Sequence, residues 1–244
     1  MNEEQLKVFL NEEQLKIEKE GYIQGINPLM GRFHHKFNMK PIPYGNKNKE
    51  IFYTSIRNEL KDIKYYFWGE IKLTIILYLN ESRRYETPES GDLDNYSKAI
   101  NDAISGINGI IIDDTQIQTL TVQWMDTMGE EYFEIEISSH PDEFILKDVE
   151  FYEMPNGLYY PFSKKYWTVE GVKESDITAL LTLCYETIKI QKPFKHKLRT
   201  SGLNKEEAYY QAQKVHPILR GFHLNRVRDF KKYKLSEWKK SEII

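Results

Sequence analysis

Apolar residues in the first half of the chain recur with two different periods. Between Ile51 and Tyr66 they return at helical spacing, at Ile56, Leu60 and Ile63. Ile71–Leu79, in contrast, is a continuous run rich in β-branched and aliphatic residues. The pattern therefore predicts a helix followed by a buried strand.

A second helix and further strands are predicted after residue 93. Asp94 and Asn95 are suited to cap a helix through Ser105, because the apolar residues that follow lie on one helical face. Gly106–Gly109 ends that helix. The predicted extended segments are Ile110–Ile112, Ile117–Met125 and the period-two stretch Tyr132–Ser138, with a hairpin turn at Thr127–Glu130.

The two ends of the chain differ from this central region. Residues 1–20 contain an Asn-Glu-Glu-Gln-Leu-Lys segment twice and predict an amphipathic helix. Residues 142–244 are expected to form a mainly helical extension, with helices near 175–190, 204–219 and 224–240. We expect an α/β (α+β) fold: a small mixed sheet flanked by helices over residues 21–141, followed by this extension.

Composition excludes several classes of protein. The 244 residues are 40% hydrophobic and 29% charged, as in ordinary globular chains. The 71–79 run is far shorter than the ~20 residues that cross a bilayer, so no membrane partner is expected. The acidic start Met1-Asn2-Glu3-Glu4 does not resemble a secretory signal. With Cys184 the single cysteine, a cytoplasmic location is expected.

Charge is distributed unevenly, although the net charge is only −3. Residues 187–240 hold 15 Lys and Arg and four acids, a net charge of +11, and the remainder therefore carries −14. Aromatic residues lie among these cations. The segment is suited to a polyanion such as DNA, with Arg226, Arg228, Lys231 and Lys232 as candidate contacts, although a solvated helical face would show the same composition. Arg83 and Arg84, in a polar loop, are further candidates.

Carboxylates gather around the second predicted helix. Asp92 and Asp94 lie two apart at its start, Lys98 lies one turn later, and Asp113 and Asp114 follow a short strand that a turn could bring back beside the helix start. Converging carboxylates require a hard cation, and Mg²⁺ prefers such oxygen ligands. A helix amino terminus also favours phosphate, and a nearby lysine can stabilise charge on a phosphoryl oxygen. These are the components of metal-assisted phosphodiester hydrolysis.

Two other interpretations apply to this segment. An EF-hand requires Gly at position six and Glu at position twelve of its loop, but counting from Asp92 gives Ser97 and Ala103, so that interpretation fails. A simple helix cap and turn would be the usual role of Asp-x-Asp-Asn taken alone. The complete set of acids and lysine favours chemistry instead.

The order Asp-Leu-Asp-Asn-x-x-Lys, helix, hydrophobic strand and Asp-Asp-x-Gln-Ile resembles the RusA family of Holliday-junction resolvases, phage-derived endodeoxyribonucleases. The resemblance covers residues 69–138 well and 21–68 weakly, and it does not reach 142–244. It implies that Asp92, Asp94 and Asp114 hold the metal, that Lys98 is catalytic, and that Asp113 is the adjoining acid.

The resemblance further implies a Mg²⁺-dependent endonuclease, with Mn²⁺ as a substitute, that resolves four-way junctions or other branched DNA as a homodimer during recombination and repair. The alternative is a non-catalytic DNA-binding or recombination-accessory protein on the same fold. Intact acids and an intact lysine argue against that alternative.

Overall fold

The computed structural model describes residues 31–86, 91–140, 143–163, 171, 173–213 and 220–239. The chain divides into two compact units, one ending at Phe144 and the other beginning at Ile145. Sheets and helices occur in both, so the expected α+β class is confirmed. The predicted helix of residues 1–20 lies outside the described residues.

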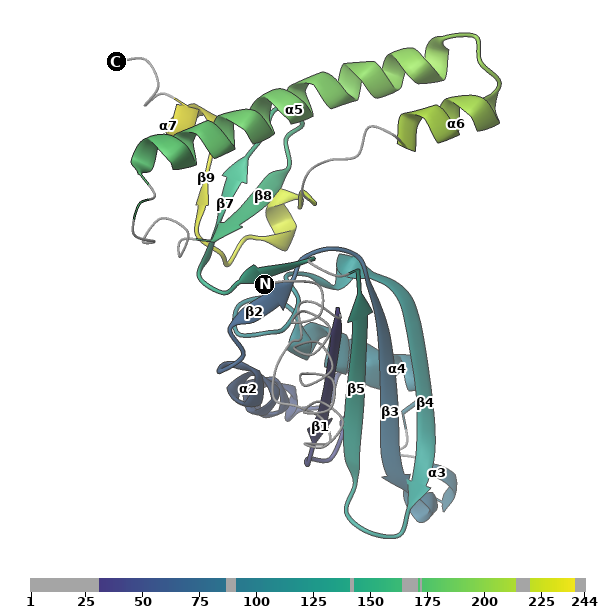
Figure 1. Cartoon of the computed structure of the whole chain (residues 1–244). Coiled ribbons are helices and arrows are strands. Elements are labelled where there is room, and N and C mark those ends of the chain that lie inside the picture. The colour runs from purple at the N-terminus through teal and green to yellow at the C-terminus, as the bar shows by residue number, and fades with distance from the viewer. Residues whose placement is uncertain are drawn as a thin grey trace, which may run out of the picture. The chain divides into compact units, whose positions relative to one another are not determined.

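The first unit is built on a mixed four-stranded sheet (Figure 1). Its strands run in the order β1-β5-β3-β4, with β3 antiparallel to β5 and parallel to β4. β5 also pairs antiparallel with β1. The strands are β1 (Arg32–Phe37), β3 (Ile71–Asn80), β4 (Ile117–Thr127) and β5 (Tyr132–Ser139).

Helices cover one face of this sheet (Figure 1). They are α2 (Lys49–Leu60) and α4 (Leu93–Ile104), which pack on each other, while the short α3 (Glu81–Glu86) follows β3. Along β3 every second side chain is buried, from Leu73 to Leu79, and α4 buries Ile100 and Ile104 in the same core. Each such side chain contributes about 1.5–3 kcal/mol on burial, so this packing sets the position of α4.

The predicted hairpin at Thr127–Glu130 is wrong. β4 and β5 are joined by a short connection, yet β3 lies between them and pairs with both, so that Tyr78 is opposite Met125 on one side and Tyr132 on the other. The most apolar strand of the unit takes the central place, where both of its edges are hydrogen-bonded. β4, which alternates less clearly, is left as an exposed edge strand.

α4 is the crossover helix of a parallel β3-α4-β4 unit, and it returns the chain from the end of β3 to the start of β4. At its end the chain reverses sharply: Gly106 has φ +83°, and Ile110 N and Ile111 N both donate to Ile104 O, at 2.8 and 3.2 Å. The predicted strand 110–112 forms only isolated bridges through Ile111.

The predicted helix 51–66 also ends earlier than expected. α2 ends at Leu60, and residues Tyr65–Phe67 form the strand β2. The strand β6 spans Phe144–Leu146. Consecutive aromatic residues are better accommodated in a strand than in a helix.

The second unit joins a three-stranded sheet to one long helix. Its strands β7 (Val149–Glu153), β8 (Tyr159–Ser163) and β9 (Lys232–Tyr233) run in the order β8-β7-β9. The helices are α5 (Glu174–Thr200), α6 (Lys205–Gln213) and α7 (Leu235–Trp238). A core of Tyr152, Met154, Tyr160 and Phe162 receives Leu181, Cys184 and Ile188 from α5.

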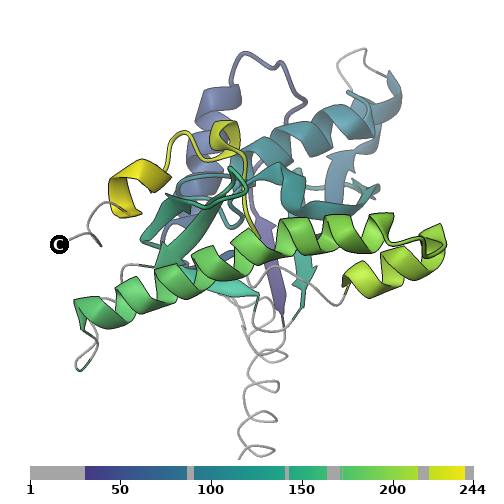
Figure 2. The same ribbon diagram turned by 90° about the horizontal axis from the view of Figure 1, so that it is seen from above.

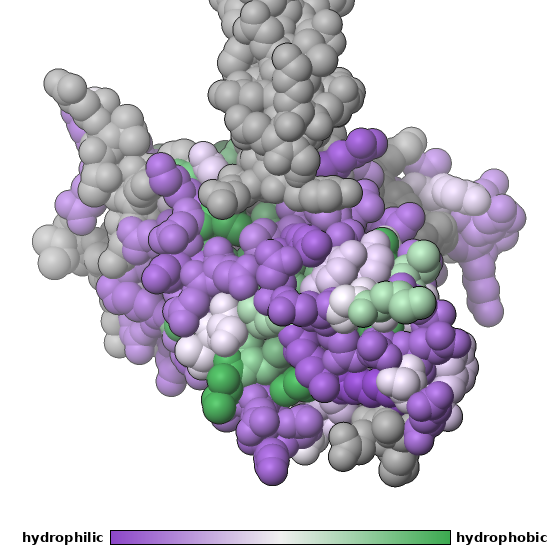
Figure 3. All heavy atoms as spheres, turned by 90° about the horizontal axis from the view of Figure 1, so that it is seen from below, coloured by the Kyte–Doolittle hydropathy of each residue, from purple (hydrophilic) through white to green (hydrophobic). Residues whose placement is uncertain are grey.

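The expected basic helix 224–240 is wrong. That segment forms a 3₁₀ turn η3 (Leu224–Arg226), then β9, then the four-residue α7. Phe222 and Phe230 pack against Phe151, which holds this segment to the sheet and prevents one continuous helix. None of the described helices combines the length and hydropathy needed to span a membrane. Seen from below, the described surface is mainly hydrophilic, with hydrophobic side chains in a few smaller areas (Figure 3).

Candidate functional site

The start of α4 holds two of the predicted carboxylates. Asp92 is the N-cap of the helix, and its side chain accepts hydrogen bonds from the backbone N of Asn95 at 3.3 Å and from the Asn95 amide group. Asp94 lies in the first turn and is exposed. Both acids lie at the positive end of the helix dipole, which attracts negative charge. The sequence prediction that both stand at the helix mouth agrees with this geometry.

Lys98 lies one turn further along α4, where it contacts an aromatic residue that the sequence interpretation missed. Its Nζ is 4.0 Å from the centre of the Tyr44 ring, and the Lys49 Nζ is 5.6 Å from the same ring. Tyr44 is held in place because its backbone N donates to Asn95 O at 2.9 Å. The loop passes close to α4 at Gly91, where an added Cβ would be 2.7 Å from that of Pro43. Cation–π contact of this kind limits where the ammonium group can move.

An ion-pair cluster lies beside this helix start. The Arg83 guanidinium is 2.5 Å from a Glu131 carboxylate oxygen, which also lies 3.4 Å from the Lys40 Nζ. Desolvation alone would raise the pKa of Glu131, but a hydrogen bond from Asn80 N and the two cations hold that pKa below its usual value. Glu131 is therefore a charged structural anchor, and Arg83 is its partner.

Arg84 is similarly engaged. It forms an ion pair with Asp126 and lies 4.6 Å from the Trp124 ring centre and 4.8 Å from that of Tyr85. Only 11% of its side chain is exposed, against 15% for Arg83. The structure thus places both arginines in contacts within the protein. Their predicted role in DNA binding stays a prediction.

The second pair of acids lies on the 3₁₀ turn η1 (Asp114–Gln116), just before β4. Asp113 caps this turn: its side chain accepts from Thr115 N at 3.1 Å and from Thr115 Oγ1 at 2.5 Å. Asp114 is exposed on the turn itself. The two neighbouring acids therefore have different surroundings, as expected for consecutive residues that point different ways.

Gln116 anchors that turn, and sequence reasoning gave it no role. Its side chain is fully buried and makes four hydrogen bonds. Its Oε1 accepts from Ile112 N at 2.7 Å and Asp113 N at 3.0 Å, and its Nε2 donates to Phe67 O at 3.0 Å and Gly69 O at 2.9 Å. A Gln three residues after an N-capping Asp is the available sequence signal, because that spacing forms a capping box.

The expected convergence of the acids does not occur within the one chain described. Asp92 caps the first turn of α4, whereas Asp113 follows shortly after Ile111, whose N bonds to Ile104 O in the last turn. Twelve helical residues span about 18 Å. Among the described residues, no three His, Cys, Asp or Glu side chains are placed to hold one metal ion. The reason is topological: a crossover helix returns the chain to the start of the strand, opposite the helix start.

The donor chemistry at the start of α4 nevertheless fits a hard cation. Asp92 and Asp94 offer carboxylate oxygens at a helix amino terminus. Mg²⁺ is typically held by one or two carboxylates while water and substrate phosphate complete its coordination. The two carboxylates at the start of α4 satisfy that requirement.

The basic residues of the second unit have mixed surroundings. The Lys231 Nζ lies 2.7 Å from Oε1 of the buried Glu150, and this hydrogen bond raises the pKa of Lys231 above its usual value. Tyr233 OH also bonds to Glu150, at 3.2 Å. The Lys232 Nζ donates to the carbonyl oxygens of Arg228 and Phe230, at 2.5 and 3.3 Å. Both lysines thus help to fix the β9 segment.

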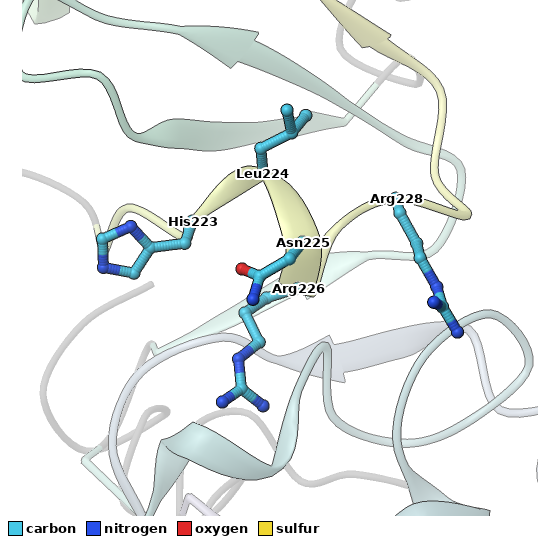
Figure 4. A pocket seen from close by; sticks show the side chains of 5 residues that line it. All are labelled: His223, Leu224, Asn225, Arg226 and Arg228. Carbon is cyan, nitrogen blue, oxygen red and sulfur yellow. The ribbon is translucent and has the colours of Figure 1, made fainter.

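Arg226 and Arg228 line an open pocket of about 550 Å³ with His223, Leu224 and Asn225. In Figure 4 the side chains of Arg226 and Arg228 both point downward, while Leu224 points upward. Both arginines are exposed, and Arg228 also lies 3.6 Å from its neighbour Asp229. Of the four cations predicted to contact DNA in this unit, these two have the more accessible charges.

Comparison with known proteins supplies the remaining observation. No curated protein matches the chain. Residues 44–138 match the model of the RusA endodeoxyribonuclease family, and they run from Tyr44 through α4 and the Asp113–Asp114 turn to β5. The match thus contains both acid pairs, Lys98 and Tyr44, and the resemblance found in the sequence is confirmed. Residues 44–138, which are 95 of the 244 residues of this chain, are thus similar to the RusA family of endodeoxyribonucleases.

Proposed function

We propose that this protein is a Mg²⁺-dependent endonuclease that resolves Holliday junctions or other branched DNA, with Mn²⁺ as a substitute metal. The single observation that supports it most is that the RusA family match spans both acid pairs and Lys98. Asp92 and Asp94 would hold the ion. When bound, its chemistry is charge neutralisation at the scissile phosphate and a lower pKa for coordinated water.

The chain's own residues position the substrate. The first turn of α4 presents the backbone N–H groups of Leu93 and Asp94, which together with the helix dipole attract a phosphate oxygen. Lys98, steadied by the Tyr44 ring, brings a positive charge to the same end of the helix. A cation so placed stabilises the negative charge that develops on a phosphoryl oxygen as the bond to the leaving group breaks.

We also propose that the active form is a homodimer. A four-way junction has two-fold symmetry and needs two matched cuts, which a C₂ dimer supplies. Within one chain the two acid pairs lie at opposite ends of α4. In a dimer, the Asp113–Asp114 turn of the second copy would complete the site at the start of α4 in the first copy. Mixing Asp94→Asn chains with Asp114→Asn chains tests this: shared sites predict recovered cleavage in the mixture, and independent sites predict none.

The Arg226–Arg228 pocket is proposed as a further contact to the DNA backbone. Two exposed guanidinium groups beside an exposed Asn and His suit phosphate oxygens, to which Arg forms paired hydrogen bonds. Such contacts carry no sequence information and strengthen binding to any DNA.

One observation favours a second candidate, a non-catalytic DNA-binding protein on the same fold. It is the absence, among the described residues, of three ligating side chains in one place. The two candidates differ in a single assay.

The test is nicking of a synthetic four-way junction beside a linear duplex of the same sequence, with Mg²⁺ and with EDTA. A nuclease predicts Mg²⁺-dependent cuts on the junction only. Tight junction binding with no cuts under any metal would select the non-catalytic candidate instead.

A further inference from the structure

The helix α5 has two apolar faces, of which the sheet covers one. Leu181, Cys184 and Ile188 are buried against β7 and β8. Four other apolar side chains of the same helix are largely exposed: Leu180 at 50%, Leu183 at 58%, Ile190 at 62% and Phe194 at 44%. We call these four residues, together with Thr187, the α5 stripe.

The spacing of the α5 stripe is that of a helix–helix interface. Its members follow one another at intervals of three, four, three and four residues, the a and d positions of a heptad repeat. At about 100° per residue they fall within about 80° of one another around the helix. The stripe is therefore one continuous seam, about 20 Å long, rather than scattered exposed residues.

Within the described part of the second unit this seam has no helix over it along most of its length. α6 folds back beside the carboxyl-terminal part of α5 (Figures 1 and 2), and Phe194 is still 44% exposed there. The unit thus leaves exposed the kind of surface that proteins normally bury against a partner.

Charge along α5 indicates what that partner is. The half of α5 before Ile188 is acidic and has no Lys or Arg; its acids are Glu174, Asp176 and Glu186. The half after Ile188 is basic and has no acid; its cations are Lys189, Lys192, Lys195, Lys197 and Arg199. Two copies of α5 placed antiparallel set the acidic half of each against the basic half of the other. A parallel pair would place like charges together.

We propose that the α5 stripe binds the same stripe of a second copy of this chain, antiparallel and centred on Thr187. About this centre, Leu180 meets the partner's Phe194, Leu183 meets the partner's Ile190, and Asp176 lies near the partner's Lys197. Such an isologous contact closes as a C₂ dimer. α5 lies outside the matched domain 44–138, and the proposal does not depend on nuclease activity.

Cross-linking at the centre of the seam is the first test. With Thr187→Cys in the full chain and a short bis-maleimide, we expect covalent dimers to form at micromolar protein. Thr178→Cys, exposed on the far side of α5, is the matched control and should give few. Adding Leu183→Lys and Ile190→Lys should slow cross-linking at position 187 more than about 10-fold, because each buried apolar side chain contributes to the seam. Cross-linking no faster than the control, or unchanged by the two lysines, overturns the proposal.

Charge reversal tests the orientation. Asp176→Lys and Lys197→Glu should each reduce cross-linking of the Thr187→Cys chain, and the double variant should recover it, since each chain then offers a complementary pair again. Circular dichroism checks that α5 still forms, because Asp176 also accepts a hydrogen bond from Lys173 N. Additive loss in the helical double variant overturns the antiparallel arrangement.

Discussion

Replacing Gln116 with leucine should destabilise the first unit strongly. The Gln116 amide makes four hydrogen bonds and is not exposed to water. Leucine has a similar size but cannot form these bonds, so the substitution leaves two backbone N–H groups and two carbonyl groups without their partner. Each buried group left without a partner costs about 1–3 kcal/mol. Part of this is offset by the apolar side chain, and we expect a loss of about 3–6 kcal/mol, a large share of the ~5–15 kcal/mol that stabilises a typical domain.

Urea unfolding, followed by tryptophan fluorescence, measures this loss, with Gln118→Leu on the exposed edge strand β4 as the matched control. Amide hydrogen exchange adds a local measurement: Ile112 N and Asp113 N should lose protection first, since both donate to Gln116. A loss below about 1 kcal/mol, with those amides still protected, would refute the idea that Gln116 holds the Asp113–Asp114 turn.

The remaining predictions concern the acids and the basic pocket. Asp114→Asn should eliminate junction cleavage. Asp113→Asn removes a turn cap, so it should reduce cleavage less but lower the melting temperature. Single-turnover cleavage and calorimetry distinguish these two effects. Replacing Arg226 and Arg228 by Ala should weaken binding to all DNA sequences alike and flatten the salt dependence of the affinity, measured by fluorescence anisotropy; an unchanged slope would remove the pocket from the interface. Folding lowers the pKa of Glu131, so the charged carboxylate should stabilise the protein relative to Glu131→Gln. This stabilisation should be complete at pH values above the pKa of an unfolded Glu, about 4.3, and should disappear as the pH falls below that pKa. A stability difference that instead grew on acidification would contradict that assignment.

Local structure in the matched domain could be predicted well from residue patterns. α4 and β3 follow from apolar spacing and from a capping Asp, signals that lie within a few residues of one another. The strand order could not be predicted in this way. A short polar connection between β4 and β5 suggests a hairpin, and nothing local indicates that β3 lies between them.

The same limit applied to the candidate site. Sequence spacing placed Asp92, Asp94 and Lys98 together correctly, since one helix start holds all three. The position of Asp113 and Asp114 depends on the direction of α4 relative to β3, a long-range property. Gln116 was overlooked because a buried amide with four backbone partners has no distinctive sequence pattern beyond its spacing from Asp113.

The basic carboxy-terminal segment shows how packing overrides composition. Its cations suggested one long helix, but Phe222 and Phe230 bury against Phe151, and the buried Glu150 draws Lys231 to the sheet. Those contacts join residues some 70–80 positions apart, which no local pattern can indicate.

The proposed metal site at the start of α4 is tested most directly by Asp94→Asn, with Asp62→Asn at an exposed position as the control. Cleavage and binding of a synthetic four-way junction are measured on the same preparations, across a Mg²⁺ titration. We expect Asp94→Asn to lose cleavage by about 10²-fold or more while junction affinity in the absence of metal stays equal or rises, because the substitution removes both a ligand and a charge that repels phosphate. Asp62→Asn should match the unmodified chain in both measurements. Full cleavage by Asp94→Asn would contradict the assignment of the metal to this helix start.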